Sequence, residues 1–96
     1  MKFALDFSEE ARRNYADIFE YIALDNPKKA IGFTDELYAK AEMLKDFPTL
    51  GGKNPKAKDK NRRILIFKNY KIYYFVNYEK HRIEVNYIRH GAMKEL

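Results

Sequence analysis

The sequence predicts an α+β domain of order β-α-α-β-β-β, with a helical hairpin packed on one face of a mainly antiparallel sheet. Two observations carry this prediction. Residues 9–46 hold two consecutive helical patterns with one proline-containing break, and residues 62–90 hold three strand patterns separated by short turns. Ninety-six residues suffice for one hydrophobic core, so we expect residues 1–96 to form a single domain.

The first residues predict a strand followed directly by a helix. Residues Lys2–Phe7 alternate between apolar and polar side chains, which is the period of a half-buried strand. Ser8 suits a helix N-cap, and Glu9 and Glu10 follow in the first turn, where negative charge suits the helix dipole. The apolar residues then form one stripe of an amphipathic helix. This stripe comprises Ala11, Tyr15, Ile18, Phe19 and Ile22.

A second helix is predicted from Pro27 to about Asp46. The residue before a proline is pushed out of the helical region, so Asn26 ends the connection and can cap the new helix. Pro48 and the two glycines that follow it release the chain into a loop. Helices joined by so short a connection pack antiparallel, and their wide apolar faces should also cover a sheet. The second stripe comprises Ala30, Phe33, Leu37, Ala41 and Leu44, with Tyr38 beside them.

The last third of the chain predicts three strands joined by two turns: Arg62–Lys68, Tyr70–Asn77 and Arg82–His90. In the middle strand, Tyr73 and Phe75 face away from the more apolar side. We therefore expect these two rings on an open sheet face, as part of an interface with a partner.

Alternation along the strands makes two further predictions. Residues Ile64–Phe67 are apolar on both faces, so we expect that strand to be central in the sheet or covered on both sides. In the last strand, Arg89 continues the face of Val85 and Tyr87. His90 then lies on the opposite face, because adjacent residues of a strand point in opposite directions.

Positive charge is concentrated in one loop. The net charge is +5 and the sequence pI is about 9.4, which suggests a polyanionic partner such as nucleic acid, an acidic protein or anionic lipid. Between Gly51 and Arg63 there is one acidic residue, Asp59. We expect the basic residues of this stretch to bind a target or its phosphates. They are Lys53, Lys56, Lys58, Lys60, Arg62 and Arg63. For Arg63 the sequence leaves two interpretations open: it pins the loop or an acidic side chain at the sheet edge, or it binds an acidic partner.

The composition disfavours several kinds of protein. There is no cysteine, and two histidines without metal-ligand spacing make a poor case for a metal, so we expect neither a metal nor a cofactor. No window approaches the roughly 18 apolar residues of a membrane span, so we expect no membrane partner. The acidic residues near the N-terminus do not fit a signal peptide, and we expect a cytoplasmic protein.

Four segments, taken in order, carry a family resemblance. They are Asp17–Ala23 with Asp25-Asn26-Pro27; Leu44, Phe47-Pro48 and Leu50-Gly51; Arg63 with Tyr70 and Tyr74; and Arg89-His90-Gly91-Ala92. With these segments in this order, the chain resembles the RelE/ParE toxin superfamily, whose fold is the architecture predicted above. The resemblance covers nearly the whole chain and implies a type II toxin neutralised by a cognate acidic antitoxin.

The resemblance leaves two targets open. RelE-like members cleave mRNA in the ribosome, whereas ParE-like members poison DNA gyrase. The Asp-Asn-Pro turn and the ending His90-Gly91-Ala92 are closer to the ParE-like branch, which favours gyrase as the partner. The alternative is a ribosome-dependent mRNA endonuclease.

A metal-independent nuclease would draw on Arg63, Arg89 and His90, which could supply a base or acid and cations for the phosphate. Strand parity sets Arg89 and His90 on opposite faces. In addition, residues 93–96 lack the tyrosine seen in RelE-like tails. The antitoxin could add a strand to the sheet edge or lay a helix on the helical hairpin, and the sequence does not choose between them.

Overall fold

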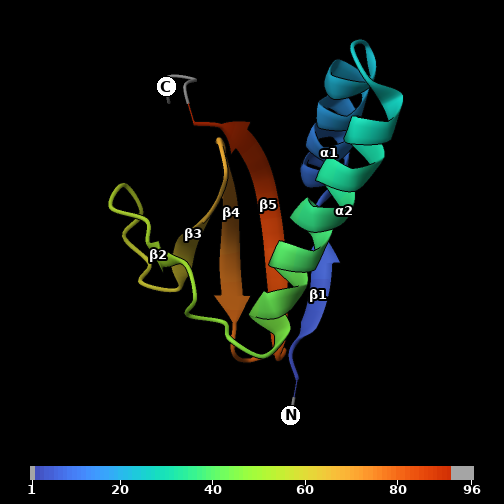
Figure 1. Ribbon diagram of the computed structural model, residues 1–96. Helices are drawn as coiled ribbons and strands as arrows, with labels where there is room; N and C mark the ends of the chain where they lie inside the picture. The colour runs from blue at the N-terminus through green and yellow to red at the C-terminus, as the bar shows by residue number, and fades with distance from the viewer. Residues whose placement is uncertain (1, 92–96) are drawn as a thin grey trace.

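The computed structural model describes residues 2–91 and shows two helices on one face of a five-stranded sheet (Figure 1). The strand order is β1-β5-β4-β3-β2, and every neighbouring pair is antiparallel except β1 and β5. This confirms the predicted α+β architecture. The elements are β1 (Ala4–Phe7), α1 (Glu9–Ala23), α2 (Pro27–Glu42), the 3₁₀ turn η1 (Met43–Lys45), β2 (Gly52–Lys53), β3 (Arg62–Phe67), β4 (Tyr70–Asn77) and β5 (Arg82–His90).

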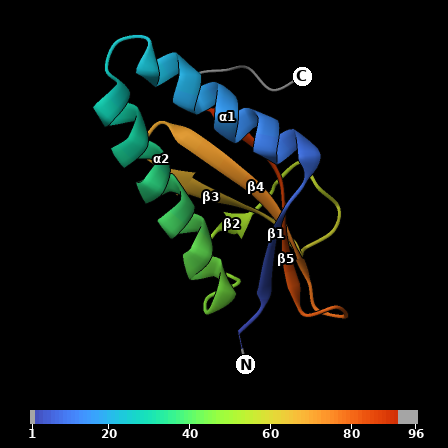
Figure 2. The ribbon, with the colours of Figure 1, turned by 90° about the vertical axis from the view of Figure 1, so that its right-hand side faces the viewer.

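The two helices form the expected antiparallel hairpin, which lies across the sheet in Figure 2. The Ser8 hydroxyl accepts a hydrogen bond from the Ala11 N–H at 3.0 Å, and the Asn26 side chain accepts one from the Lys29 N–H at 3.1 Å. Both predicted caps are therefore present. Helix α2 ends at Glu42, four residues before the predicted Asp46, because the chain tightens there into η1.

The hydrophobic core lies between the hairpin and one face of the sheet. The helices contribute most of their predicted stripes, although Phe19 is not among the residues that pack in or against the core, and β4 and β5 supply most of the side chains opposite them. Burial of this apolar surface is the main stabilising term for the domain. The core comprises Ala11, Ile18, Leu37, Leu44, Leu65, Ile72, Tyr74, Val76, Ile83, Val85 and Ile88. Within residues 2–91, no helix is long and apolar enough to cross a membrane.

A β-bulge in β5 corrects the predicted facing of the strand's second half. Tyr73 pairs with Tyr87 but Tyr74 pairs with Val85, so Asn86 is an extra residue. The extra residue reverses the alternation, and Ile88, 4% exposed, joins Val85 in the core. The prediction that Tyr87 shares the face of Val85 is therefore wrong.

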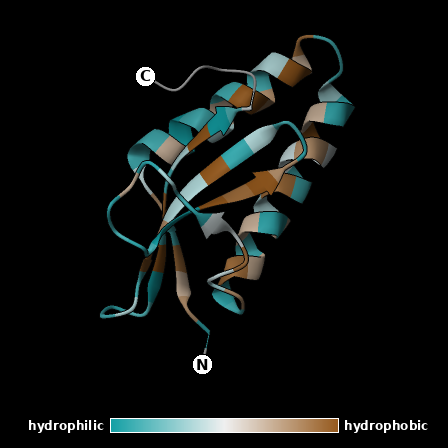
Figure 3. Ribbon diagram, turned by 90° about the vertical axis from the view of Figure 1, so that its left-hand side faces the viewer, coloured by the Kyte–Doolittle hydropathy of each residue, from teal (hydrophilic) through white to brown (hydrophobic). Residues whose placement is uncertain are grey.

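Of the two alternatives predicted for β3, a position inside the sheet is confirmed, because β3 lies between β4 and β2, whereas cover on both faces is wrong. Leu65 packs in the core, whereas Ile66 on the other face is 56% exposed. The face turned away from the helices carries the connection between β2 and β3, which is mostly hydrophilic (Figure 3). Strand β2, which the sequence did not predict, pairs only with Arg63 and Ile64 of β3. We call the side of the sheet opposite the hairpin the open face.

Candidate binding surface

The loop that leads to the basic segment is held from the helix-covered face of the sheet. Arg63 and Tyr74 pair across β3 and β4, and both point toward the loop after η1. Arg63 Nε donates to the Gly51 carbonyl at 2.6 Å, and a second guanidinium nitrogen donates to the Thr49 carbonyl at 3.3 Å. These two bonds make Arg63 an anchor for the loop.

Tyr74 completes this anchor. Its hydroxyl donates to the Pro48 carbonyl at 2.7 Å and accepts from the Gly51 N–H at 3.0 Å. Burial raises the pKa of Tyr74, against smaller opposing effects from the Gly51 bond and from Arg63. Gly51 is required at this position, because a Cβ there would lie 2.6 Å from the Ile64 carbonyl oxygen.

On the open face, two arginines lie over aromatic rings. The Arg62 guanidinium is 5.1 Å from the centre of the Phe75 ring, and one of its nitrogens donates to the Asn86 side chain at 3.3 Å. The Arg89 guanidinium is 4.6 Å from the centre of the Tyr87 ring. Both distances are within the range of cation–π attraction.

A pair of tyrosines lies between these arginines. Tyr73 stacks on Tyr87 across β4 and β5, with ring centres 4.4 Å apart and an interplanar angle of 25°. The rings and guanidiniums of three strands thus form one continuous surface. We call Arg62, Tyr73, Phe75, Tyr87 and Arg89 the open-face cluster.

The Tyr73 hydroxyl is unusual within the open-face cluster. Tyr73 is 4% exposed, and its hydroxyl is buried without a hydrogen-bond partner in the part of the chain that the structure describes. A buried polar group without a partner is uncommon, because it has lost its bonds to water. The neighbouring Tyr74 hydroxyl, by contrast, makes two hydrogen bonds.

The basic loop between β2 and β3 is shaped by side-chain turns. The Asn54 side chain accepts from the Lys56 N–H at 3.0 Å, and the Asp59 carboxylate accepts from the Asn61 N–H at 2.9 Å. Its lysines Lys53, Lys56, Lys58 and Lys60 are all exposed. The loop therefore displays its charge to solvent at one edge of the sheet.

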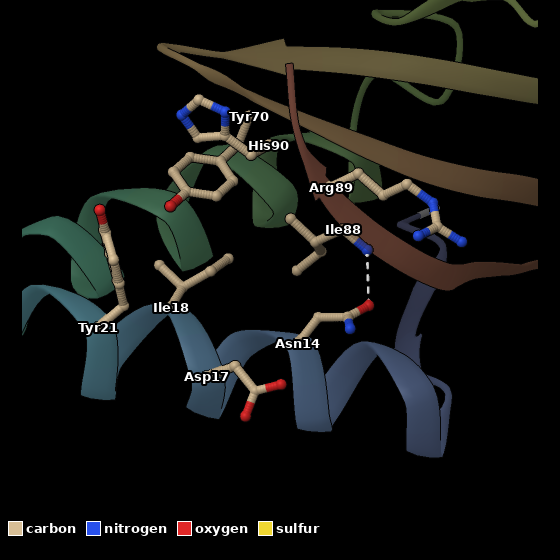
Figure 4. A pocket seen from close by; sticks show the side chains of 8 residues that line it. All are labelled: Asn14, Asp17, Ile18, Tyr21, Tyr70, Ile88, Arg89 and His90. Carbon is tan, nitrogen blue, oxygen red and sulfur yellow. Dashed lines mark hydrogen bonds between the residues drawn. The ribbon is translucent and has the colours of Figure 1, made fainter. Parts of the chain in front are cut away.

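His90 lies on the helix-covered face, at the opposite end of the sheet from Arg63. Its ring packs edge-on against Tyr70, with ring centres 5.1 Å apart. Burial, together with the nearby Tyr21, raises the pKa of Tyr70. A cleft of about 430 Å³ lies here between α1 and β5 (Figure 4). It is lined by Asn14, Asp17, Ile18, Tyr21, Tyr70, Ile88, Arg89 and His90.

The structure does not bring Arg63, Arg89 and His90 together. Arg63 pairs with Tyr74 and His90 pairs with Tyr70, so they are separated by about 13 Å along β4. Arg89 and His90 point apart in Figure 4. The prediction that Arg89 and His90 lie on opposite faces of the sheet is therefore confirmed. Because of the bulge, however, each of them lies on the face that was predicted for the other. Residues 93–96, where a tail tyrosine is missing, lie outside the described residues.

Other predicted site residues do come together. Arg62, Tyr73 and Phe75 share the open face, as expected for the two aromatic residues. Sequence reasoning placed Tyr87 and Arg89 on the wrong face of β5, because it did not detect the bulge. Ile88 carried a usable signal, since an apolar residue at that position breaks the strict alternation.

Comparisons with known proteins agree with this fold. A family model described as "ParE toxin of type II toxin-antitoxin system, parDE" matches residues 5–95. No match is found among curated proteins.

Three solved structures are similar in fold. A chain of the chromosomal ParDE system from P. aeruginosa is 17% identical, with a TM-score of 0.75 over 93% of this chain and 96% of that one. The toxin–antitoxin complex RelBE2 from Mycobacterium tuberculosis has a chain 14% identical, with a TM-score of 0.70 over 97% and 95%. The isolated E. coli RelE toxin is 17% identical, with a TM-score of 0.70 over 97% and 88%.

Proposed function

The chain belongs to the ParE toxin family of type II toxin–antitoxin systems, and on that premise we propose that it arrests growth by inhibiting DNA gyrase in the cytoplasm. A cognate acidic antitoxin neutralises it. In this proposal the lysines of the basic loop approach the target, and the open-face cluster provides a second, aromatic surface. No metal or cofactor takes part.

The separation of Arg63, Arg89 and His90 is the observation that carries this proposal. A nuclease needs its acid, base and phosphate-binding cations within hydrogen-bond reach of one scissile bond. Arg63 is bonded to the backbone of Gly51 and Thr49, and His90 lies about 13 Å further along the sheet. The arrangement supports a protein that acts by binding.

Two assays with the purified protein test the proposal. In a gyrase supercoiling reaction we expect inhibition and trapped gyrase–DNA cleavage complexes. In a translating ribosome extract we expect intact mRNA by primer extension. Induction in cells should arrest growth, and coexpression of the neighbouring reading frame should restore it. Codon-positioned mRNA cuts without any effect on gyrase would refute a gyrase-directed function.

The open-face cluster favours one alternative, a ribosome-dependent mRNA endonuclease. Arg62 and Arg89 could neutralise phosphates, and the rings of Tyr87 and Phe75 could stack on bases. This function predicts mRNA cuts that disappear in Arg89→Ala and persist in Lys28→Ala, a matched loss of charge on α2. Cuts that also disappear in His90→Ala would restore a role for the predicted catalytic set.

A further inference from the structure

Charge is divided unequally between the two sides of the molecule. The helical hairpin, residues 9–42, has five basic and eight acidic residues, whereas residues 52–90 have eleven basic and three acidic ones. The helices and the basic loop lie on opposite sides of the sheet in Figure 1. An acidic partner is therefore attracted to the open face and its loop and repelled by the hairpin.

The exposed apolar residues near the end of α1 do not reverse this preference. Tyr21 is 73% exposed and Leu24 is 86% exposed near the end of α1. The surface around them includes the acidic residues Asp17 and Glu20. A carboxylate-rich segment would meet like charge at this position.

The open-face cluster also has donors ready for carboxylates. Arg62 makes no ion pair within residues 2–91, and the carboxylate nearest to Arg89, that of Glu10, is 4.0 Å away. By contrast, Arg82 binds Glu84 at 2.7 Å on the same sheet. A guanidinium stacked on a ring keeps its N–H edge available for a carboxylate.

The Tyr73 hydroxyl is a second, independent sign of a missing partner. It is buried on the open face between Arg62 and Arg89, and within residues 2–91 no group accepts a hydrogen bond from it. The stacking on Tyr87 fixes the Tyr73 ring, so the hydroxyl cannot turn out into water without breaking that contact. A partner that rearranges this contact and brings an acceptor to the hydroxyl would satisfy it.

We infer that the open-face cluster is the docking site for an acidic segment of the cognate antitoxin. Carboxylates of that segment bind the N–H edges of Arg62 and Arg89, and one acceptor takes the hydrogen bond of Tyr73. This inference rests on the proposed toxin function. It selects the open face over the hairpin as the surface that the antitoxin covers.

The first test is Tyr73→Phe, which has opposite effects on stability and binding. Removing an unsatisfied buried hydroxyl should raise the melting temperature of the free protein by about 4 °C. The same change should weaken the antitoxin complex roughly tenfold, because the acceptor loses its donor. Tyr78→Phe, at an exposed turn residue, is the matched control and should change neither quantity.

The second test compares the antitoxin affinity of Arg62→Gln with that of Lys28→Gln. Both remove one positive charge from an exposed residue, but only Arg62 lies in the open-face cluster. We expect Arg62→Gln to weaken the complex at least tenfold and Lys28→Gln to change it less than twofold. The probe is the purified product of the neighbouring reading frame, with affinity measured by calorimetry and stability by thermal unfolding.

The outcomes separate this inference from the function on which it rests. If the neighbouring product restores growth and binds all variants equally, the docking site is wrong while the toxin function stands. Loss of binding in Leu24→Glu but not in Arg62→Gln would assign the antitoxin to the hairpin. A single-stranded RNA oligonucleotide that binds the cluster while the neighbouring product does not would overturn the inference in favour of RNA. Failure of every neutralisation assay would overturn the proposed function itself.

Discussion

Tyr73 and Tyr74 are neighbours on β4, yet their hydroxyls differ in their hydrogen bonding and in the face of the sheet on which they lie. The Tyr74 hydroxyl, on the helix-covered face, joins the Pro48 carbonyl and the Gly51 N–H to the sheet. The Tyr73 hydroxyl, on the open face, is buried and has no hydrogen-bond partner among residues 2–91. The Tyr74 side of the sheet is therefore satisfied within the chain, whereas the open face carries one buried hydroxyl that no group of residues 2–91 satisfies.

The largest expected effect on stability is a difference in side-chain packing between the two faces of the sheet. Ile72 is fully buried under the helices, and Ile66 is 56% exposed on the open face. Ile72→Ala should lower the free energy of unfolding by about 3 kcal/mol, because it leaves a cavity in the core. Ile66→Ala should lower it by less than about 1 kcal/mol. Urea unfolding followed by circular dichroism measures both, and equal losses would contradict the division of faces.

The next effect tests the loop anchor. Tyr74→Phe keeps the ring but leaves the Pro48 carbonyl and the Gly51 N–H without their partner. We expect a loss of about 2 kcal/mol in the free energy of unfolding, with faster hydrogen exchange at Gly51. The sign is opposite to that expected for Tyr73→Phe. A gain in stability for Tyr74→Phe would show that the anchor contributes nothing.

Much of the helix-covered side could be predicted from the sequence because its signals are local. Ser8 and Asn26 cap helices through contacts three residues away, and the apolar stripes follow helical spacing. A role for Arg63 in pinning the loop was one of the two interpretations that the sequence allowed, but its bonding partners could not be predicted in this way. Its partners Thr49 and Gly51 are brought to it by the turn after η1, which no local pattern specifies.

The open face was predicted less well because it depends on strand pairing. Tyr73 and Phe75 were placed correctly, since β4 alternates without interruption. The bulge at Asn86 is set by the match between β4 and β5, so the sequence of β5 alone misassigned Tyr87 and Arg89. Ile64 and Ile66 were taken as evidence of a second covering layer, although they lie on the open face.

A smaller effect on stability is expected from Glu84, an acidic residue of the open face that already has an ion-pair partner. Glu84 binds Arg82 at 2.7 Å and also accepts from the Asn77 side chain at 3.2 Å. The Arg82 hydrogen bond is the main cause that holds the pKa of Glu84 below its usual value of 4.5. A depressed pKa stabilises the fold above pH 4.5, and this contribution is lost as the pH falls through the lower folded-state value.

Glu84→Gln should therefore reduce stability at pH 7 by at most about 1 kcal/mol, because the pair is partly exposed. At a pH below the folded-state pKa, the variant and the parent should converge. Thermal unfolding between pH 7 and pH 3 measures the difference. A gap that widens toward low pH would contradict the assigned direction of the shift.

The smallest effect on stability belongs to the basic loop, which tests whether its charge serves a partner. Lys58 and Lys60 are exposed, so Lys58→Gln with Lys60→Gln should change the free energy of unfolding by less than about 0.5 kcal/mol. In the gyrase assay, the double variant should need several-fold more protein at low salt, because electrostatic steering is weaker. The difference should shrink as added salt screens the loop. Lys28→Gln with Lys29→Gln, on α2, removes the same charge from the other side of the sheet. If that control weakens inhibition equally, net charge and not the loop sets the association.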